Sequence, residues 1–184
     1  FDIKKFAIKS DLNFDNLKIN YRSNFIKKYL TSFDNKITIK NPQILFEYSN
    51  DIINFQLDGK YLLQNKEDNF FIKYKGSENN YELYTLLNLD DSDLKIDEIQ
   101  YLKKKNIPSK LEILLNKSIN GFNLQKISFK ENKNYISIDN LYISDDFKLQ
   151  SVDKIDANFF NSKGVKNNFQ IKKNSNNYQF IGTQ

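Results

Sequence analysis

The side chains with the clearest potential for chemistry are acidic residues gathered near the middle of the chain. Asp90, Asp91, Asp93, Asp97 and Glu98 lie close together in the sequence, and carboxylate oxygens are the ligands that calcium prefers in proteins. Their spacing fits no calcium-binding loop, because no glycine stands at the sharp turn and no acid stands at the final ligand position. A solvated turn between two strands explains this cluster better, so we expect no metal site.

Most other catalytic residue types are missing. The sequence contains no Cys, no His and no Trp, which removes the thiolate nucleophile, the imidazole base and the usual zinc ligands. No glycine-rich phosphate loop or serine elbow is present. Among the 23 acidic residues, no pair can be singled out as glycosidase carboxylates without geometry. We therefore predict a protein that is not an enzyme and needs no cofactor; a carbohydrate-active β-enzyme is a less favoured alternative.

The basic residues give the chain a net charge of +5 and a pI near 9.1. The run Lys103–Lys105 could touch anionic lipid headgroups, although a solvated loop is the simpler interpretation. Only Arg22 among the 28 basic residues is an arginine, whereas phosphate-reading surfaces usually rely on arginine forks. Together with 27 asparagines, this composition is typical of an AT-rich genome, and we expect no nucleic-acid partner.

β-Strands must position these residues. The alternation of apolar and polar residues that predicts strands is clearest in residues 134–159. Apolar and polar residues alternate in Tyr135–Ile138, in Leu141–Ile143 with its extension Phe147–Leu149, and in Val152–Phe159. A period of two gives each strand one apolar and one polar face. The predicted breaks between these strands are Asp139-Asn140, Asp145-Asp146 and Asp153-Lys154.

The same alternation fills most of the chain, and short strands separated by Asn, Asp, Gly and Pro are typical of an all-β protein. Ser23–Phe33 departs from it, because its apolar residues fall at helical spacing and predict a helix of about three turns. A further turn is predicted at Asn41-Pro42. The other predicted strands are Phe1–Lys9, Phe14–Tyr21, Ile37–Lys40, Ile44–Tyr48, Ile53–Leu57, Tyr61–Leu63, Phe70–Lys75, Tyr81–Leu89, Leu94–Tyr101, Leu111–Leu115, Phe122–Leu124, Ile127–Lys130, Phe169–Lys172 and Tyr178–Ile181.

This pattern amounts to about fourteen strands, and an open twisted sheet of more than about ten strands curls, closes or splits in two. One face is apolar throughout, and only one predicted helix is available to cover it. Two arrangements satisfy these conditions: a closed sandwich or barrel, or a long curled trough.

A family resemblance favours the trough. In residues 94–114 (LKIDEIQYLKKKNIPSKLEIL) a strand leads to an aromatic-x-Lys motif at Tyr101 and Lys103, then to Pro108 and a second apolar strand at Leu111. Asn106 stands where a Gly is expected. With the strand pair Tyr135–Ile143 and the hairpin Phe169–Gly182, residues 94–182 resemble AsmA-like envelope proteins of the TamB and YhdP types, and Ile37–Gly59 is weakly similar.

The resemblance implies a mainly β fold, an elongated, curled, mostly antiparallel sheet that forms an apolar groove, with one short helix. It implies a non-enzymatic segment of a bridge that carries phospholipid acyl chains between the inner and outer membranes of a Gram-negative envelope. Residues 1–184 would then be a single β-groove segment of a larger periplasmic protein, anchored to the inner membrane by a helix outside this segment. The first residue, Phe1, and the absence of Met agree with a piece of a longer chain.

The apolar positions on one face of the predicted strands are the residues expected to line the groove. They are Leu17, Ile19, Ile37, Ile39, Ile44, Phe46, Ile53, Phe55, Leu57, Leu87, Leu89, Ile113, Ile136, Ile138, Leu141, Ile143 and Ile155. The alternative from a different class is a closed β-sandwich, a binding or adhesion module of a surface protein, in which the same residues form a dry core.

Overall fold

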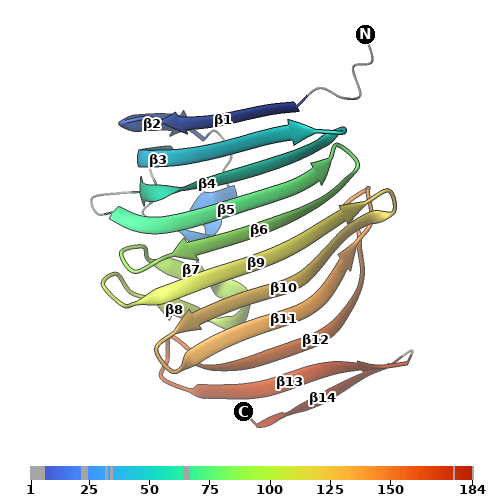
Figure 1. Ribbon diagram of the computed structural model, residues 1–184. Helices are drawn as coiled ribbons and strands as arrows, with labels where there is room; N and C mark the ends of the chain where they lie inside the picture. Colours follow the sequence, from blue (N-terminus) through green and yellow to red (C-terminus); the bar gives the residue numbers. More distant parts are fainter. Residues whose placement is uncertain are drawn as a thin grey trace.

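The computed structural model describes residues 7–21, 25–31, 33, 35–63, 67–175 and 177–183. In this part of the chain, twelve strands form one large antiparallel sheet and two short strands form a separate pair (Figure 1). The large sheet is curled and not closed, so the predicted mainly β, mostly antiparallel curled fold is confirmed.

The strands follow one another across the sheet almost in chain order. From one edge to the other they are β1 (Ala7–Asn13), β3 (Lys36–Ser49), β4 (Ile52–Leu62), β5 (Glu67–Ser77), β6 (Asn80–Asn88), β9 (Ser109–Ser118), β10 (Gly121–Glu131), β11 (Asn134–Ile143), β12 (Leu149–Phe160), β13 (Lys166–Asn174) and β14 (Asn177–Thr183). Strand β2 (Asn16–Asn20) pairs with the first part of β3, while β1 pairs with its second part.

One exception to chain order lies between β6 and β9, which are neighbours in the sheet. Residues 89–108, here called the insert, leave the sheet between these two strands. The insert contains β7 (Leu94–Ile96), the 3-10 helix η2 (Asp97–Ile99) and β8 (Tyr101–Lys103), and β7 pairs only with β8. The predicted single strand Leu94–Tyr101 is therefore wrong, since Gln100 adopts a left-handed conformation (φ 53°) that reverses the chain.

The pairing registers show that the sheet has one apolar face. Residues directly opposite each other in antiparallel strands share a face. One such row crosses from β1 to β14 and contains a single polar side chain: Leu12, Ile44, Leu57, Ile72, Thr85, Ile113, Ile127, Ile138, Ile155, Ile171 and Phe180. The neighbouring row on the other face is mostly polar: Asp11, Leu45, Gln56, Lys73, Tyr84, Leu114, Lys126, Asp139, Lys154, Lys172 and Gln179.

Two of the predicted turns lie inside continuous strands. Strand β3 runs through Asn41 and Pro42, which together face Gly59 of β4. A bulge suits proline because no ladder hydrogen bond is required of its nitrogen. Strand β11 likewise runs through Asn140, which has φ 51°. At the β3 bulge and at Asn140 the alternation slips by one position, so Ile39 and Ile44 in β3, and Ile138 and Leu141 in β11, all lie on the apolar face.

The remaining differences from the predicted elements are local. Strand β12 is continuous through the predicted break at Asp153-Lys154, and Phe147 lies in the turn before it rather than in a strand. Helix α1 spans only Phe25–Tyr29. Part of the predicted helix 23–33 and most of the predicted strand 1–9 lie outside the described residues.

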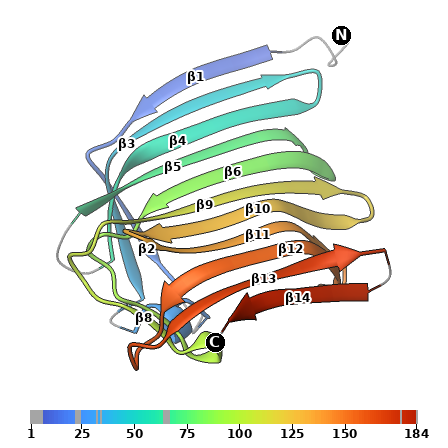
Figure 2. The ribbon, with the colours of Figure 1, turned by 90° about the horizontal axis from the view of Figure 1, so that it is seen from below.

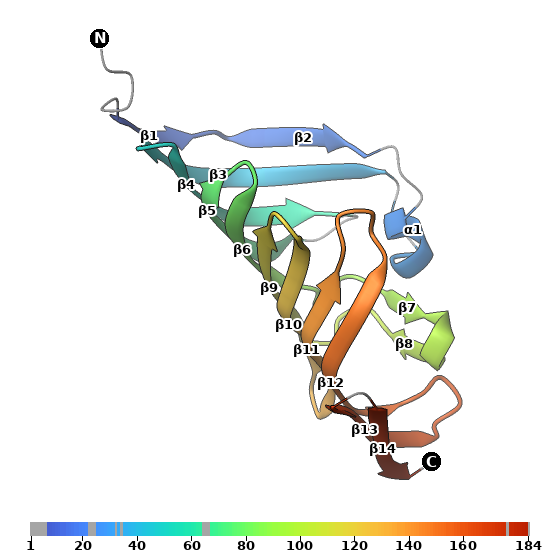
Figure 3. The ribbon, with the colours of Figure 1, turned by 90° about the vertical axis from the view of Figure 1, so that its right-hand side faces the viewer.

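Helix α1 and the insert lie on the apolar side of the sheet, near one end of its strands (Figure 2). At the two edges of the sheet, β2 with the adjoining part of β3, and β13 with β14, extend toward this same side, so the apolar face is the inside of the curl (Figure 3). The hydrophobic core sits between the insert and the adjacent ends of the strands.

Candidate functional site

The apolar face divides into a covered half and an open half. In the covered half, sheet residues form one buried cluster with Tyr101 of the insert, and Leu94, Ile96 and Ile99 of the insert pack against it. The sheet members of this cluster are Ile39, Tyr61, Phe70, Phe129, Ala157 and Phe159, and Leu89, the first residue of the insert, is also a member.

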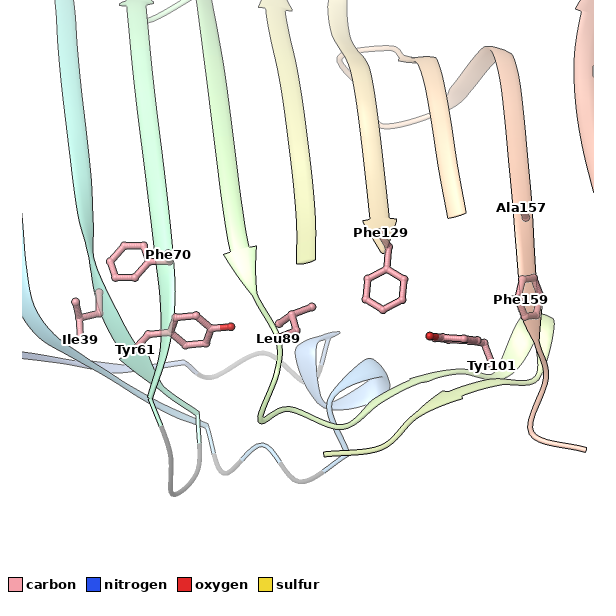
Figure 4. Packing of buried hydrophobic residues seen from close by; sticks show 8 residues of the cluster. All are labelled: Ile39, Tyr61, Phe70, Leu89, Tyr101, Phe129, Ala157 and Phe159. Carbon is pink, nitrogen blue, oxygen red and sulfur yellow. The ribbon is translucent and has the colours of Figure 1, made fainter. Parts of the chain in front are cut away.

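Tyr101 holds the insert against the sheet. It is only 1% exposed and lies between Phe129 and Phe159, with ring centroids 5.7 and 5.5 Å away in edge-to-face geometry (Figure 4). Its hydroxyl donates a hydrogen bond to the Glu131 carboxylate, which also accepts one from the Asn134 amide at 2.9 Å. Burial, together with the nearby Glu131 charge, raises the pKa of the Tyr101 phenol above its usual value.

Lys103 fixes the far end of β8 from inside the protein. Its side chain is fully buried, and its ammonium donates to the backbone oxygens of Asp90, Ser92 and Lys104 at 3.2, 2.7 and 3.1 Å. Burial lowers the pKa of this ammonium, and the carboxylates of Glu131 and Asp68 act in the opposite direction. Lys103 is thus neither a solvated residue nor a headgroup contact, which corrects our interpretation of that position in the basic run.

The acidic residues beside Lys103 form hydrogen bonds to the backbone. Asp68 accepts from the Asp91 amide at 3.1 Å, and Asp90 accepts from the Ser109 amide at 2.8 Å. Burial raises the pKa of the Asp68 carboxyl. No group of three or more potential metal ligands occurs among the residues that the structure describes. These acids attach the start of the insert to β5 and β9.

The open half lies toward the other end of the strands, and no described element packs over it (Figures 2 and 3). A second apolar row crosses it through Phe46, Phe55, Tyr74, Leu83, Leu115, Leu124, Leu141 and Val152. A third row contains Tyr48, Ile53, Gly76, Tyr81, Lys117, Phe122 and Ile143. Most of these side chains are half-buried by their neighbours in the sheet.

Lys117 is the one charged residue in these two rows. Its ammonium lies 4.9 Å from the centroid of the Phe122 ring and 2.7 Å from an Asp145 oxygen. Its charge is therefore balanced within the protein. The open half offers a ligand an apolar surface and few polar groups to recognise.

The seventeen predicted lining residues all lie on the apolar side of the sheet, but they do not all lie in its open half. Nine are in the open half: Ile44, Phe46, Ile53, Phe55, Ile113, Ile138, Leu141, Ile143 and Ile155. Six belong to the buried cluster or pack against it: Ile37, Ile39, Leu57, Leu87, Leu89 and Ile136. Leu17 and Ile19 extend the face at the edge strand β2, opposite Ile39 and Ile37.

Several residues of the open half were absent from that prediction, among them Tyr74, Leu83, Leu115, Leu124 and Val152. Their alternation with polar neighbours was visible in the sequence. The insert as a cover for one half of the face was not visible there, because its contacts with the sheet join residues far apart in the chain.

Comparisons with known proteins found no family model, no curated protein and no solved structure that matches this chain. Within the described residues, no helix is long and apolar enough to cross a membrane. The geometry of the apolar face is therefore the main basis for assigning a function.

Proposed function

We propose that the chain is a non-enzymatic segment of a bridge-like phospholipid transport protein of the Gram-negative cell envelope. The open half of the apolar face shields acyl chains from water, while headgroups stay outside. The observation that carries this proposal is the apolar row from Leu12 to Phe180, which crosses the whole sheet on its inner side. The placement in the periplasm, between inner and outer membranes, rests on the resemblance to AsmA-like proteins.

The physical argument starts from the cost of exposed apolar surface. Soluble proteins rarely expose contiguous apolar patches beyond a few hundred Å², and larger patches mark sites of interaction. From β9 to β12 the rows through Ile113 and Leu115 continue across neighbouring strands without a polar side chain, as a surface that follows extended hydrocarbon chains requires. Because the charge of Lys117 is balanced by Asp145, acyl chains suit this surface better than a polar ligand.

The closed β-sandwich alternative requires a second sheet over the open half. Among the described residues, the only strands outside the large sheet are β7 and β8, and these lie over the covered half. The adhesion module is therefore the less favoured proposal.

Two adjacent residues of β9 provide a matched test. Leu115 lies on the apolar face opposite Leu83 and Leu124, whereas Leu114 lies on the polar face opposite Tyr84 and Lys126. Each is replaced in turn by the photocrosslinker p-benzoylphenylalanine, and the chain is irradiated with vesicles that contain a fluorescent phospholipid. We expect several-fold more crosslinked lipid at position 115 than at position 114.

Far-UV circular dichroism of both variants verifies that the sheet is intact. Equal crosslinking at the two positions, or none at position 115 in folded protein, would contradict the proposal. Crosslinking to another protein at position 115 would favour the adhesion module.

A further inference from the structure

Two neighbouring turns at the open end of the sheet carry the most exposed large apolar side chains among the described residues. They are the β9–β10 turn and the β11–β12 turn, and we call residues 117–121 and 143–149 the tip. Ile119 is 80% exposed, Phe147 is 78% exposed and Leu149 is 65% exposed. Exposed apolar residues concentrated on two adjacent turns indicate a surface with a partner.

Several contacts hold the two turns together. An ion pair joins Lys117 to Asp145 at 2.7 Å, and the Phe122 and Phe147 rings stack with centroids 5.6 Å apart. Gly121 packs so closely on the neighbouring turn that a Cβ atom there would lie 2.3 Å from the Ile143 oxygen. The tip is therefore a built structure that presents its apolar side chains in a fixed arrangement.

Phe147 adopts a conformation that bulky residues rarely take. Its φ is 59°, in the left-handed region, where a Cβ-bearing aromatic residue is an uncommon exception. A polar residue or glycine would form this turn with less strain. The position nevertheless holds a large aromatic ring that remains mostly exposed although it stacks on Phe122, which indicates a role outside the folded core.

We propose that the tip inserts into the interfacial region of a phospholipid bilayer. This inference rests on the proposed function, since the tip adjoins the open half: Phe122 is paired with Ile143, and Ile143 with Leu149. A bilayer in contact with the tip would thus meet the apolar face directly. Acyl chains could pass between the two without crossing water.

The net charge of the tip and the small number of its protruding side chains favour a bilayer as its partner, with no need for anionic lipid. The tip contains two lysines and two aspartates, paired as Lys117–Asp145 at 2.7 Å and Lys148–Asp146 at 2.6 Å. Its net charge is zero, so anionic lipid offers it no Coulombic attraction. Three protruding side chains are also far fewer than a stable protein interface uses, whereas interfacial insertion needs only a small buried apolar area.

The absence of Trp from the sequence makes a direct experiment possible. The F147W variant of the 184-residue chain is titrated with phosphatidylcholine vesicles while tryptophan emission is recorded. Phe160, 53% exposed at the far end of β12, gives the matched control F160W. We expect a blue shift for F147W and none for F160W, and the same shift when anionic phosphatidylglycerol is added to the vesicles.

A second pair of variants measures binding in a vesicle flotation assay. I119S/F147S removes the two most exposed apolar side chains of the tip, and the control F160S/V165S removes two exposed apolar side chains at the other end of the sheet. We expect the tip variant to lose about tenfold in partitioning and the control to retain it. No blue shift for F147W together with unchanged partitioning of I119S/F147S would overturn the proposal, and so would binding that depends on anionic lipid.

The outcome for the tip is separable from the outcome for the apolar face. If the tip variants bind vesicles like the parent while position 115 still crosslinks phospholipid, the tip proposal fails and the proposed function stands. If position 115 crosslinks no lipid while F147W still shifts, the proposed function fails and the tip is a membrane contact alone.

Discussion

Tyr101 and Lys103 turn a short hairpin into a fixed cover for half of the apolar face. Tyr101 places its ring between two phenylalanines of the sheet, and two residues later Lys103 gathers three backbone oxygens around one ammonium. An apolar contact and a polar one thus act within three residues of the same strand. The Tyr101 and Lys103 side chains are both buried, so substituting either one should change the free energy of unfolding measurably.

Substituting Tyr101 with Phe should destabilise the fold and alter its dependence on pH. The variant loses the hydrogen bond that Tyr101 donates to the buried Glu131 carboxylate. That carboxylate keeps Asn134 as its remaining partner. We expect a loss of ~1–3 kcal/mol in the free energy of unfolding at neutral pH. Because burial raises the folded pKa of Tyr101 above its ordinary value of 10.0, the native phenol contributes stability that is complete below pH 10.0 and falls progressively as pH rises above it. The difference in the free energy of unfolding between the parent and Y101F should therefore become smaller above that pH.

The measurement is urea unfolding of parent and Y101F at neutral pH and again above pH 10. Tyr142→Phe is the control, because Tyr142 is exposed; it should match the parent at neutral pH. If the difference in unfolding free energy between the parent and Y101F were the same at neutral pH and above pH 10, Tyr101 would ionise equally in the folded and unfolded chain.

Substituting Lys103 with Met should cost ~2 kcal/mol or more, because backbone oxygens in a buried site lose their donor. Lys104→Met is the control, since the Lys104 side chain is exposed and its backbone oxygen remains in place. We expect that variant to stay within about 0.5 kcal/mol of the parent. The measurement is thermal unfolding of both variants. Equal melting temperatures for K103M and K104M would refute a structural role for the Lys103 ammonium.

At the scale of the elements, irregular positions inside strands explain where the sequence interpretation succeeded and where it failed. Alternation identified nearly every strand of the sheet and the face on which each apolar residue lies. It could not distinguish an irregular position inside a strand from a turn, because both place Asn or Asp in the left-handed region. Asn50 and Asp51 have φ values of 51° and 61° in a true hairpin turn, and Asn140 has φ 51° inside a continuous strand. Only the partner strand decides between the two, and that pairing is non-local.

The close packing of the two tip turns predicts an effect of Gly121→Ala. Gly121 has φ 125°, and a Cβ would lie 2.3 Å from the Ile143 oxygen, so the turns must move apart. Gly164 has φ 79° with nothing within 4 Å of the Cβ position, and G164A controls for backbone strain alone, worth ~1 kcal/mol. We expect G121A to lose at least ~1–2 kcal/mol more than G164A in chemical denaturation. Equal losses would mean that the two turns are not held together as described.

At the scale of the whole molecule, the sheet supplies two different environments on one apolar face. Strands pair side by side across the whole sheet, but only the covered half has a second layer above it among the described residues. The sequence predicted the face and not this division, because alternation reports which side of a strand is apolar and says nothing about what lies on top of it. The division determines what a polar substitution does at each end of the strands.

Asparagine substitutions at Phe129 and at the open-half positions Phe55 and Ile138 should separate the two environments. Phe129 is 6% exposed beneath Tyr101, so F129N loses a core side chain and buries an amide, with an expected cost of ~3–5 kcal/mol. At Phe55 and Ile138 the amide can reach water, and the strand neighbours still pack, so we expect a loss nearer ~1 kcal/mol. Binding of a fluorescent acyl probe should fall for F55N and I138N by more than unfolding explains. If both melt as far below the parent as F129N while the folded fraction binds probe normally, the open half is a closed core and the proposed acyl-binding surface is wrong.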